Sequence, residues 1–473
     1  MNSLEDNKSP AALLTWPDRR TTALALLVVI IHLFVLLVVL PRFSAHLTPA
    51  YNQQLTSDGY DYLASNLAAG HGYRFYPDTA KTLMREPGYP FILAGLLTVF
   101  GNRFIAVEML NVILALGTTW FIIRVMGKIS SRRWPGFVAA LLFLFHPGIL
   151  IAESRGGVEI IFGFLSLLFL LSLYRAFDRN RSLDFVISGL ILGIALLIRS
   201  VPILFPIVVL GYMLVFLRSK ISPLSACRNF AILVVTMLAV LSPWIARNYS
   251  LTGRFIPTAS VLGVSAQAGQ YICTHLSTGR PWWLLDREAG HERSRLATEL
   301  GYSFEDGSYG YYQTFYRTAD ELSFSKVLLG RVVAEYRQHP ALFTEVVGRN
   351  LFNFWFAGKT QMATLANCVV QLPYLLLAAG GLIVGIRRRL GGIVIPIALY
   401  IGYIVAIYVP ILAQARYSVP LIPLLSILGA ILLLSLGESR KEIGELFRPD
   451  SNVEQKETIV HAVSDAGCVR GSL

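Results

Sequence analysis

Residues 21–40 read TTALALLVVIIHLFVLLVVL, an apolar run that only His32 interrupts. A helix rises about 1.5 Å per residue, so about 20 residues cross the roughly 30 Å hydrocarbon core of a bilayer. No small-residue cleavage site follows the run, and it is long for the apolar part of a signal peptide. We therefore expect it to stay in the protein as a membrane anchor.

The rest of the chain has a similar composition. Of its 473 residues, 54% are hydrophobic and only 15% are charged, and mean hydropathy is +0.57. Soluble proteins carry about 25% charged residues, so the deficit indicates lipid as the solvent. We predict an all-α polytopic membrane protein with about ten transmembrane helices. The predicted spans are 21–40, 104–123, 135–151, 157–174, 183–198, 202–217, 229–246, 368–386, 391–410 and 416–436.

Clusters of Arg and Lys in the short loops predict the orientation. The net charge of +12 is better explained by the positive-inside rule than by a nucleic-acid partner. The spans alternate without contradiction if every cluster is cytoplasmic. The clusters are at 19–20, 124–133, 175–181, 218–228 and 387–389. We predict a multi-pass protein of the plasma (inner) membrane, with a cytoplasmic N-terminus at 1–20 and a disordered cytoplasmic tail at 437–473.

Two outer regions are large enough to carry a function. The N-terminal transmembrane module, 21–246, contains the first outer loop at 41–103, and an extracytoplasmic domain at 247–367 precedes the C-terminal transmembrane helices at 368–436. No cytoplasmic loop could hold a nucleotide-binding domain, so chemistry is expected at the non-cytoplasmic face. Three segments are expected to be helices on the outer membrane surface: Tyr60–Ala69, Tyr89–Phe100 and Ala341–Phe356.

The first outer loop places charges just above the lipid. Asp58 and Asp61 lie at a predicted helix start, where an acidic residue is often only a cap. Arg85 begins the stiff turn R-E-P-G-Y-P at 85–90. Its planar fork of donors suits a lipid phosphate, although an arginine at this depth can also simply extend toward headgroups.

Further charges lie at the other outer boundaries. Glu153 and Glu159 flank the second outer hairpin, where Glu159 could pair with Arg155 or act on a substrate. Cations at the outer ends of three later spans exceed what contacts with headgroups need, and they predict an anion site for a lipid-linked phosphate. These cations are Arg199, Arg247 and Arg416.

Six motifs occur in a fixed order over about 370 residues. They are SDGYDYLASNLAAGHGY (57–73), REPGYPFILAGLLTVFG (85–101), VEIIF (158–162), GLILGIALLIRS (189–200), SPWIARNYSLTGRFIP (242–257) and ARYSVPLIPLL (415–425). In this order the chain resembles the integral-membrane glycosyltransferases of the GT-C class, in the group of protein mannosyltransferases and aminoarabinose transferases. Two departures stand out: Glu86 occupies the place of a family Lys, and residues 260–340 match no known pattern.

The resemblance implies an inverting glycosyltransferase that takes a sugar from a polyprenyl-phosphate carrier and transfers it to a protein, lipid or glycan acceptor on the outer face. It implies that Asp58 is the general base, with Glu159 positioning sugar or acceptor and Asp61 or Glu153 as substitutes. Arg85 is expected to hold the phosphate, helped by the three cations named above. Side chains expected beside the substrate are Tyr62, Tyr89, Trp244 and Asn248, although aromatic residues at this depth are more often interface anchors.

The remaining alternatives concern metal and mechanism. No residue spacing demands a cofactor, but a divalent metal could bind if Glu86 met three histidines of the outer regions, at positions 71, 146 and 275. A transporter or flippase for a lipid-linked or anionic substrate is the competing class, although no internal repeat is found. A lipid-linked glycan ligase or polymerase is a second alternative.

Overall fold

The computed structural model describes residues 28–39, 58–101, 103–130, 132–154, 157–276, 279–306 and 313–446. Within these ranges the chain is helical, apart from one antiparallel hairpin that pairs Phe304 with Phe315. The elements, after an apolar helix at Val28–Val39 that ends in η2 (Val35–Val39), are α3 (Tyr60–Ala68), α4 (Gly88–Phe100), α5 (Arg103–Ile129), α6 (Trp134–Leu144), α7 (Pro147–Glu153), α8 (Glu159–Arg179), α9 (Ser182–Ile198), η4 (Val201–Leu204), α10 (Phe205–Phe216), α11 (Pro223–Thr252), α12 (Leu262–His275), α13 (Trp282–Glu299), β1 (Phe304–Asp306), β2 (Gln313–Phe315), α14 (Thr318–Gln338), α15 (Pro340–Phe356), α16 (Gln361–Arg387), α17 (Gly391–Tyr408), η6 (Ala415–Leu421) and α18 (Ile422–Leu446).

The predicted polytopic all-α membrane fold is confirmed. Six helices are long and apolar enough to cross a membrane by themselves: α5, α8, α11, α16, α17 and the continuous η6–α18. The bent pair α6–α7 makes a seventh, and the other predicted spans coincide with shorter apolar helices at Val28–Val39, Ser182–Ile198 and Val201–Phe216. Residues 21–27 and 40 of the first predicted span lie outside the described residues.

The predicted span at 135–151 is present as a bent pair of helices, because the chain breaks the helix at Pro147. The helices α6 and α7 meet at 60°. Proline has no N–H to donate, and the residue before it is driven to an extended backbone. His146 has φ −66° and ψ 123°, and its ring Nδ1 accepts a hydrogen bond from the Gly148 backbone N–H at 3.0 Å, so it caps the helix that Pro147 begins.

The break also moves Glu153 from the predicted outer hairpin into the bundle. Its Oε2 lies 3.0 Å from His32 Nε2, and both side chains are fully buried. Asn111 Nδ2 donates to the backbone carbonyl of Glu153 at 3.1 Å. This pairing ties α7 to the first span and to α5, and it places Glu153 away from the outer charges with which it was predicted to act.

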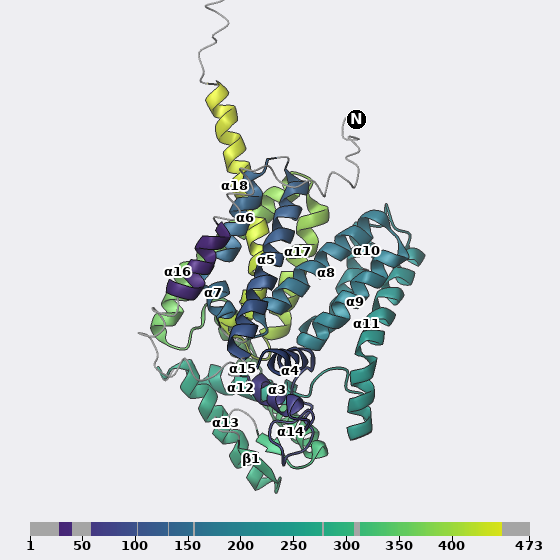
Figure 1. Cartoon of the computed structure of the whole chain (residues 1–473), viewed down its shortest axis with the longest axis vertical. Helices are drawn as coiled ribbons and strands as arrows, with labels where there is room; N and C mark the ends of the chain where they lie inside the picture. Colours follow the sequence, from purple (N-terminus) through teal and green to yellow (C-terminus); the bar gives the residue numbers. More distant parts are fainter. Residues whose placement is uncertain are drawn as a thin grey trace, which may run out of the picture.

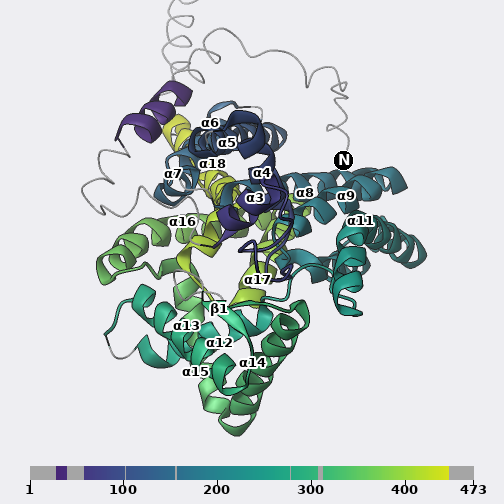
Figure 2. The same ribbon diagram turned by 60° about the horizontal axis from the view of Figure 1, so that its bottom comes forward.

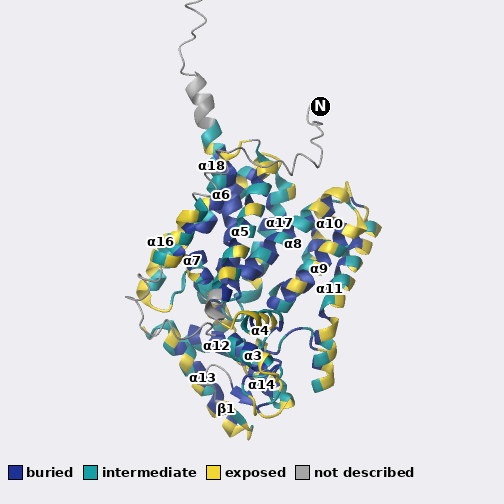
Figure 3. Cartoon of the chain, viewed as in Figure 1, coloured by how far each residue is buried: buried dark blue, intermediate teal, exposed yellow. Residues whose placement is uncertain are grey.

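The bundle is built around α8 and α18, which are its most buried spans. Close packing joins α18 to α16, and α9 to α8 and α11. Exposed apolar side chains gather on the outward surfaces of α16 and of α10 and α11 (Figure 3), with Met362 and Val369 exposed at 75% and 68%. Such surfaces are stable only against lipid, in agreement with the membrane fold.

A helical body of α12–α15 and the β hairpin lies at one end of the bundle (Figures 1 and 2). The first outer loop shares its core, because side chains from both segments form one hydrophobic cluster. The cluster includes Leu63, Tyr73, Phe75 and Met84 from the loop and Val264, Leu296, Phe315 and Phe324 from the body. In Figure 1, α3 and α4 lie between this body and the bundle. The three segments that were predicted as helices on the outer membrane surface form the helices α3, α4 and α15.

Candidate active site

Asp58 and Arg416 form an ion pair between segments 358 residues apart in the chain. The Nη1 and Nη2 atoms of Arg416 donate to the two carboxylate oxygens of Asp58, each at 2.9 Å. Arg85 approaches the same carboxylate, with Nη2 3.9 Å from Oδ1, and its Nε donates to the Asp58 backbone carbonyl at 3.2 Å. The Asp58 side chain is only 12% exposed. The paired fork geometry fixes both the position and the charge of this carboxylate.

The surrounding cations keep Asp58 ionised. Burial alone would raise the pKa of its carboxyl, but the charges of Arg416, Arg85 and Arg199 outweigh burial and hold that pKa well below its ordinary value. A carboxylate so stabilised is a weak proton acceptor. Its geometry suits it to orient a donor group or a cation.

Gly59 allows the backbone turn that positions Asp58. Gly59 has φ +77°, which side chains disfavour, and a Cβ there would come within 2.8 Å of Phe75 Cε1. The chain can therefore turn sharply from Asp58 into α3 and pack against the ring of Phe75. The first-loop motif therefore needs Gly59 for the local backbone geometry, in addition to Asp58 for its charge.

The R-E-P-G turn docks on the end of α9. A Cβ on Gly88 would lie 2.8 Å from the Leu197 carbonyl oxygen, so α4 can approach α9 this closely only with glycine there. Glu86, which is 5% exposed, accepts a hydrogen bond at 3.0 Å from the backbone N–H of Ser200. Glu86, which stands where the family has a Lys, thus caps the residues after α9. This contact brings Arg85 and Arg199 to the same end of the bundle.

Arg199 forms no ion pair within 4.0 Å among the described residues. Its guanidinium carbon lies 4.8 Å from the Tyr417 ring centroid and 5.9 Å from that of Tyr408. Its buried Nη1 makes no hydrogen bond within the described part of the chain. Buried donors are normally satisfied, so an unsatisfied guanidinium nitrogen beside two other arginines indicates a site for an anion.

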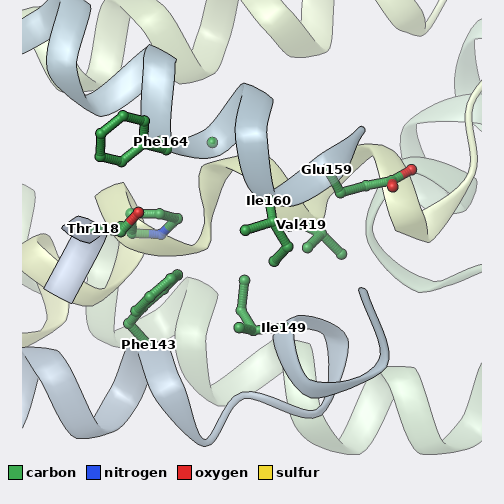
Figure 4. Close-up of a pocket in the computed structure, with 9 residues that line it drawn as sticks. Thr118, Phe143, Ile149, Glu159, Ile160, Phe164 and Val419 are labelled. Carbon is green, nitrogen blue, oxygen red and sulfur yellow. The ribbon is translucent and has the colours of Figure 1, made fainter. Parts of the chain in front are cut away.

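Glu159 starts α8 and is 6% exposed. It lies within electrostatic range of Arg199 and Arg416. Its stem borders a small pocket, about 10 Å³ in volume, whose other walls are mostly apolar. In Figure 4 the carboxylate points away from Phe143 and Phe164. Ligand pockets are about 300–1,000 Å³, so this void is too small for a sugar donor, and Glu159 faces the arginines instead. Arg155, its predicted alternative partner, lies outside the described residues.

The structure gives Arg247, Trp244 and Asn248 other partners than the ion pair. The Arg247 guanidinium stacks 4.4 Å from the Trp244 ring centroid, and its Nη1 donates to the Thr82 carbonyl at 2.9 Å. The Trp244 indole donates to the Thr258 carbonyl at 2.8 Å, and the fully buried Asn248 amide donates to that of Ile256 at 3.0 Å. These contacts favour support of the outer loops over the predicted contacts with substrate.

Aromatic side chains form the floor of the site. Tyr89, 1% exposed, packs edge-on against Tyr60 at 5.3 Å, and the Arg85 guanidinium lies 5.5 Å from the Tyr60 ring centroid. Tyr62 packs instead on Tyr76 at 5.7 Å. Asp61 is half-buried on the first turn of α3. Tyr60, Tyr408 and Tyr417 were not predicted, although Tyr60 and Tyr417 lie within quoted motifs.

The residues considered as metal ligands do not come together. The described residues contain no group of three or more His, Cys, Asp or Glu side chains that could hold a metal ion. Glu86 caps the residues after α9, His71 hydrogen-bonds Asn66, His146 caps α7, and His275 contacts Tyr271 and Thr274. This donor set does not fit a metal.

Comparisons with known proteins complete the description. Residues 84–246 match the family described as dolichyl-phosphate-mannose-protein mannosyltransferase. That segment carries Arg85, Glu159 and Arg199. No curated protein matches this sequence.

Solved structures of similar shape exist. The oligosaccharyltransferase of Archaeoglobus fulgidus, tethered to an acceptor peptide containing the NVT sequon, aligns over 89% of this chain at 12% identity and a TM-score of 0.48. This chain spans 50% of that protein's length. ArnT from Cupriavidus metallidurans bound to undecaprenyl phosphate aligns over 92% of this chain and 82% of its own (12% identity, TM-score 0.40). The apo form of the same ArnT aligns over 91% of this chain and 81% of its own length, at 15% identity and a TM-score of 0.36. With TM-scores below 0.5, these similarities add nothing here about substrate or mechanism.

The family match and the ordered motifs agree on one class of enzyme. The match covers the segment in which four of the six motifs lie wholly or in part, and the helical membrane fold is the one that the resemblance implied. These observations favour a membrane glycosyltransferase of the GT-C class over the competing transporter, on a family match that covers residues 84–246.

Proposed function

We propose that the protein transfers a sugar from a polyprenyl-phosphate carrier to an acceptor on the non-cytoplasmic face, with inversion at the anomeric carbon. The observation that carries this proposal is the buried Nη1 of Arg199, which makes no hydrogen bond among the described residues and lies beside the Arg85–Asp58–Arg416 cluster. Arg85, Arg199 and Arg416 gather at this site, and the unsatisfied Arg199 Nη1 offers a donor to a phosphate oxygen.

The placement of the site supports a lipid-linked donor. Its residues come from the connections at one end of the spans, next to the body of α12–α15, whereas the basic loops lie at the opposite ends of the same helices. By the positive-inside rule the site then faces away from the cytoplasm. Soluble nucleotide sugars are not supplied there, so the activated sugar must arrive on a lipid.

The arrangement of charges supports displacement of the phosphate. A polyprenyl phosphate leaves well when cations stabilise its developing charge, so it needs no strong general acid. Arg85 and Arg199 are the proposed phosphate ligands, and Glu159 the proposed contact for the sugar. Asp58 orients the acceptor, which attacks the anomeric carbon from the face opposite the phosphate. The acceptor is a hydroxyl or amine of a protein, lipid or glycan.

Arg199→Gln tests the phosphate site. Farnesyl phosphate, a short polyprenyl phosphate, would be titrated into purified wild-type and variant protein in detergent. Charge-assisted hydrogen bonds contribute about 1.5–3 kcal/mol, so we expect Arg199→Gln to weaken binding about 10- to 100-fold. Arg254→Gln, on an exposed residue after α11, is the matched control and should bind as the wild type does. Equal affinity in Arg199→Gln and wild type, or no binding by the wild type, would contradict the proposal.

A further inference from the structure

The ring of Tyr417 lies against two arginines of the site. The Arg199 guanidinium carbon is 4.8 Å from the ring centroid, and the Arg416 guanidinium carbon is 5.3 Å from it. A cation within roughly 6 Å of an aromatic centroid is attracted to the negative face of the ring. Tyr417 is only 9% exposed, so water screens this attraction little. One ring therefore contacts both the arginine whose buried Nη1 makes no hydrogen bond among the described residues and the arginine that holds Asp58.

Two further rings support Tyr417 from behind. Tyr408, the last residue of α17, stacks on Tyr417 with the centroids 4.5 Å apart and the planes inclined by 23°. Phe354 of α15 is fully buried and packs on Tyr408 at 5.8 Å. The three rings come from α15, α17 and η6, so packing between separate elements fixes the orientation of the Tyr417 ring.

Hydrogen bonds fix the backbone on both sides of Tyr417. Gln371 Nε2, from α16, donates to Ser418 Oγ at 3.0 Å, and Ser418 Oγ donates to the Ala415 carbonyl at 2.7 Å. The Gln371 and Ser418 side chains are both buried, and buried hydrogen bonds between fixed partners leave a segment little freedom. The 3-10 helix η6 therefore holds the ring of Tyr417 in one place.

The two arginines serve different parts of the proposed reaction. Arg199 is a proposed ligand of the phosphate that leaves, and Arg416 holds Asp58, which orients the acceptor that attacks. These two groups lie on opposite sides of the anomeric carbon, so their relative placement decides how often they align for transfer. An arginine side chain has several rotatable bonds, and ordering it costs entropy. A buried ring that contacts both guanidiniums restricts both of them at once.

We propose that Tyr417 is a positioning residue, whose ring holds the phosphate-binding guanidinium of Arg199 at a fixed place relative to the Arg416–Asp58 pair. This inference rests on the proposed function. Tyr417 acts through the two arginines and exchanges no proton with the substrates. The face of its ring is therefore the feature that matters, and its hydroxyl is dispensable.

The first test is a double-mutant cycle between Tyr417 and Arg199. Farnesyl phosphate would be titrated in detergent into the wild type, Tyr417→Leu, Arg199→Gln and the double variant. Tyr417→Phe is added because it keeps the ring and removes only the hydroxyl. Tyr249→Leu, at a tyrosine of α11 that is 59% exposed, is the matched control.

We expect Tyr417→Leu to weaken farnesyl phosphate binding about 5- to 30-fold, as the loss of a desolvated cation–π contact implies. In the Arg199→Gln background the same substitution should change the affinity by less than about twofold, because the guanidinium on which the ring acts is already gone. Tyr417→Phe and Tyr249→Leu should bind as the wild type does.

A second test changes only the charge distribution of the ring. Trifluorophenylalanine at position 417 has nearly the shape of phenylalanine, but its fluorines withdraw electron density from the ring face and weaken its attraction for a guanidinium. We expect this protein to bind farnesyl phosphate more weakly than Tyr417→Phe does. The rate of polyprenyl phosphate release at saturating donor should fall in the same order, because the Arg416–Asp58 pair loses the same support.

Equal affinity in Tyr417→Leu and the wild type would overturn the inference. An equal loss in both backgrounds would overturn it too, since general damage is additive and a role exerted through Arg199 is not. Arg199→Gln would still weaken binding in either case, so the proposed function would stand. If Tyr417→Leu fails to fold, trifluorophenylalanine that binds as well as Tyr417→Phe would overturn the inference equally. No binding by the wild type would instead contradict the proposed function itself.

Discussion

The charged residues of the site differ in the side chains with which they pair. Asp58, Arg85, Arg199 and Arg416 are all at the ends of elements, and their charges in apolar surroundings made them predictable from sequence. Their pairing was not predictable, because Asp58 and Arg416 are 358 residues apart and only the fold brings them together.

Replacing Asp58 by Asn should lower stability in a pH-dependent way. The carboxylate has a depressed pKa in the folded state, so its contribution is complete above the ordinary Asp value of about 3.9 and is lost as pH falls below it. Since Arg416 is 34% exposed, we expect a contribution of about 1–2 kcal/mol at pH 7. Thermal unfolding of both proteins in detergent measures it. A stability difference that does not shrink between pH 5 and pH 3 would contradict this electrostatic origin.

At the scale of elements, the sequence predicted where helices lie better than how they bend. Runs of about 20 apolar residues predicted the spans, because lipid demands that length. The same criterion concealed the break at His146 and Pro147, since both halves of 135–151 are apolar. The shared core of the first loop and the outer body was also not predictable, because it depends on contacts between side chains more than 150 residues apart.

The Glu321 carboxylate on α14 joins the first outer loop to the outer body. Glu321, 6% exposed, accepts hydrogen bonds from Thr82 Oγ1 at 2.6 Å, from the Leu83 backbone N–H at 2.9 Å and from Ser260 Oγ at 2.7 Å. Thr82 and Leu83 lie three and two residues before Arg85. The outer body thereby holds the turn that carries Arg85 in place.

Glu321→Gln should loosen that turn. An amide presents only one acceptor oxygen, so at least one buried donor loses its partner, at a cost of about 1–3 kcal/mol. We expect faster hydrogen exchange at residues 79–90 and weaker farnesyl phosphate binding, with little change in α8 or α18. Glu299→Gln, 60% exposed on α13, is the control. Exchange that stays at the wild-type rate in 79–90 would show that other contacts hold the turn.

At the scale of the whole molecule, the site lies where three parts meet. The bundle supplies Glu159, Arg199 and Arg416, the first loop supplies Asp58 and Arg85, and the outer body holds the first loop through Glu321. Under the proposed function, a lipid-borne substrate approaches this site from the bilayer and an acceptor approaches it from the aqueous side. The sequence predicted the first two contributions from motifs at the span ends. It could not predict the third, because the outer body has no recognised pattern.

The most direct measurement is sugar release from a lipid carrier. Purified wild type, Asp58→Asn and Asp78→Asn, a matched control on an exposed residue of the same loop, would be incubated with polyprenyl-phosphate monosaccharides and cell-envelope extract. The account predicts that wild type and Asp78→Asn release polyprenyl phosphate from at least one donor, and that folded Asp58→Asn does so at least 100-fold more slowly. Release by none of the proteins from any donor, or equal release by Asp58→Asn, would contradict it.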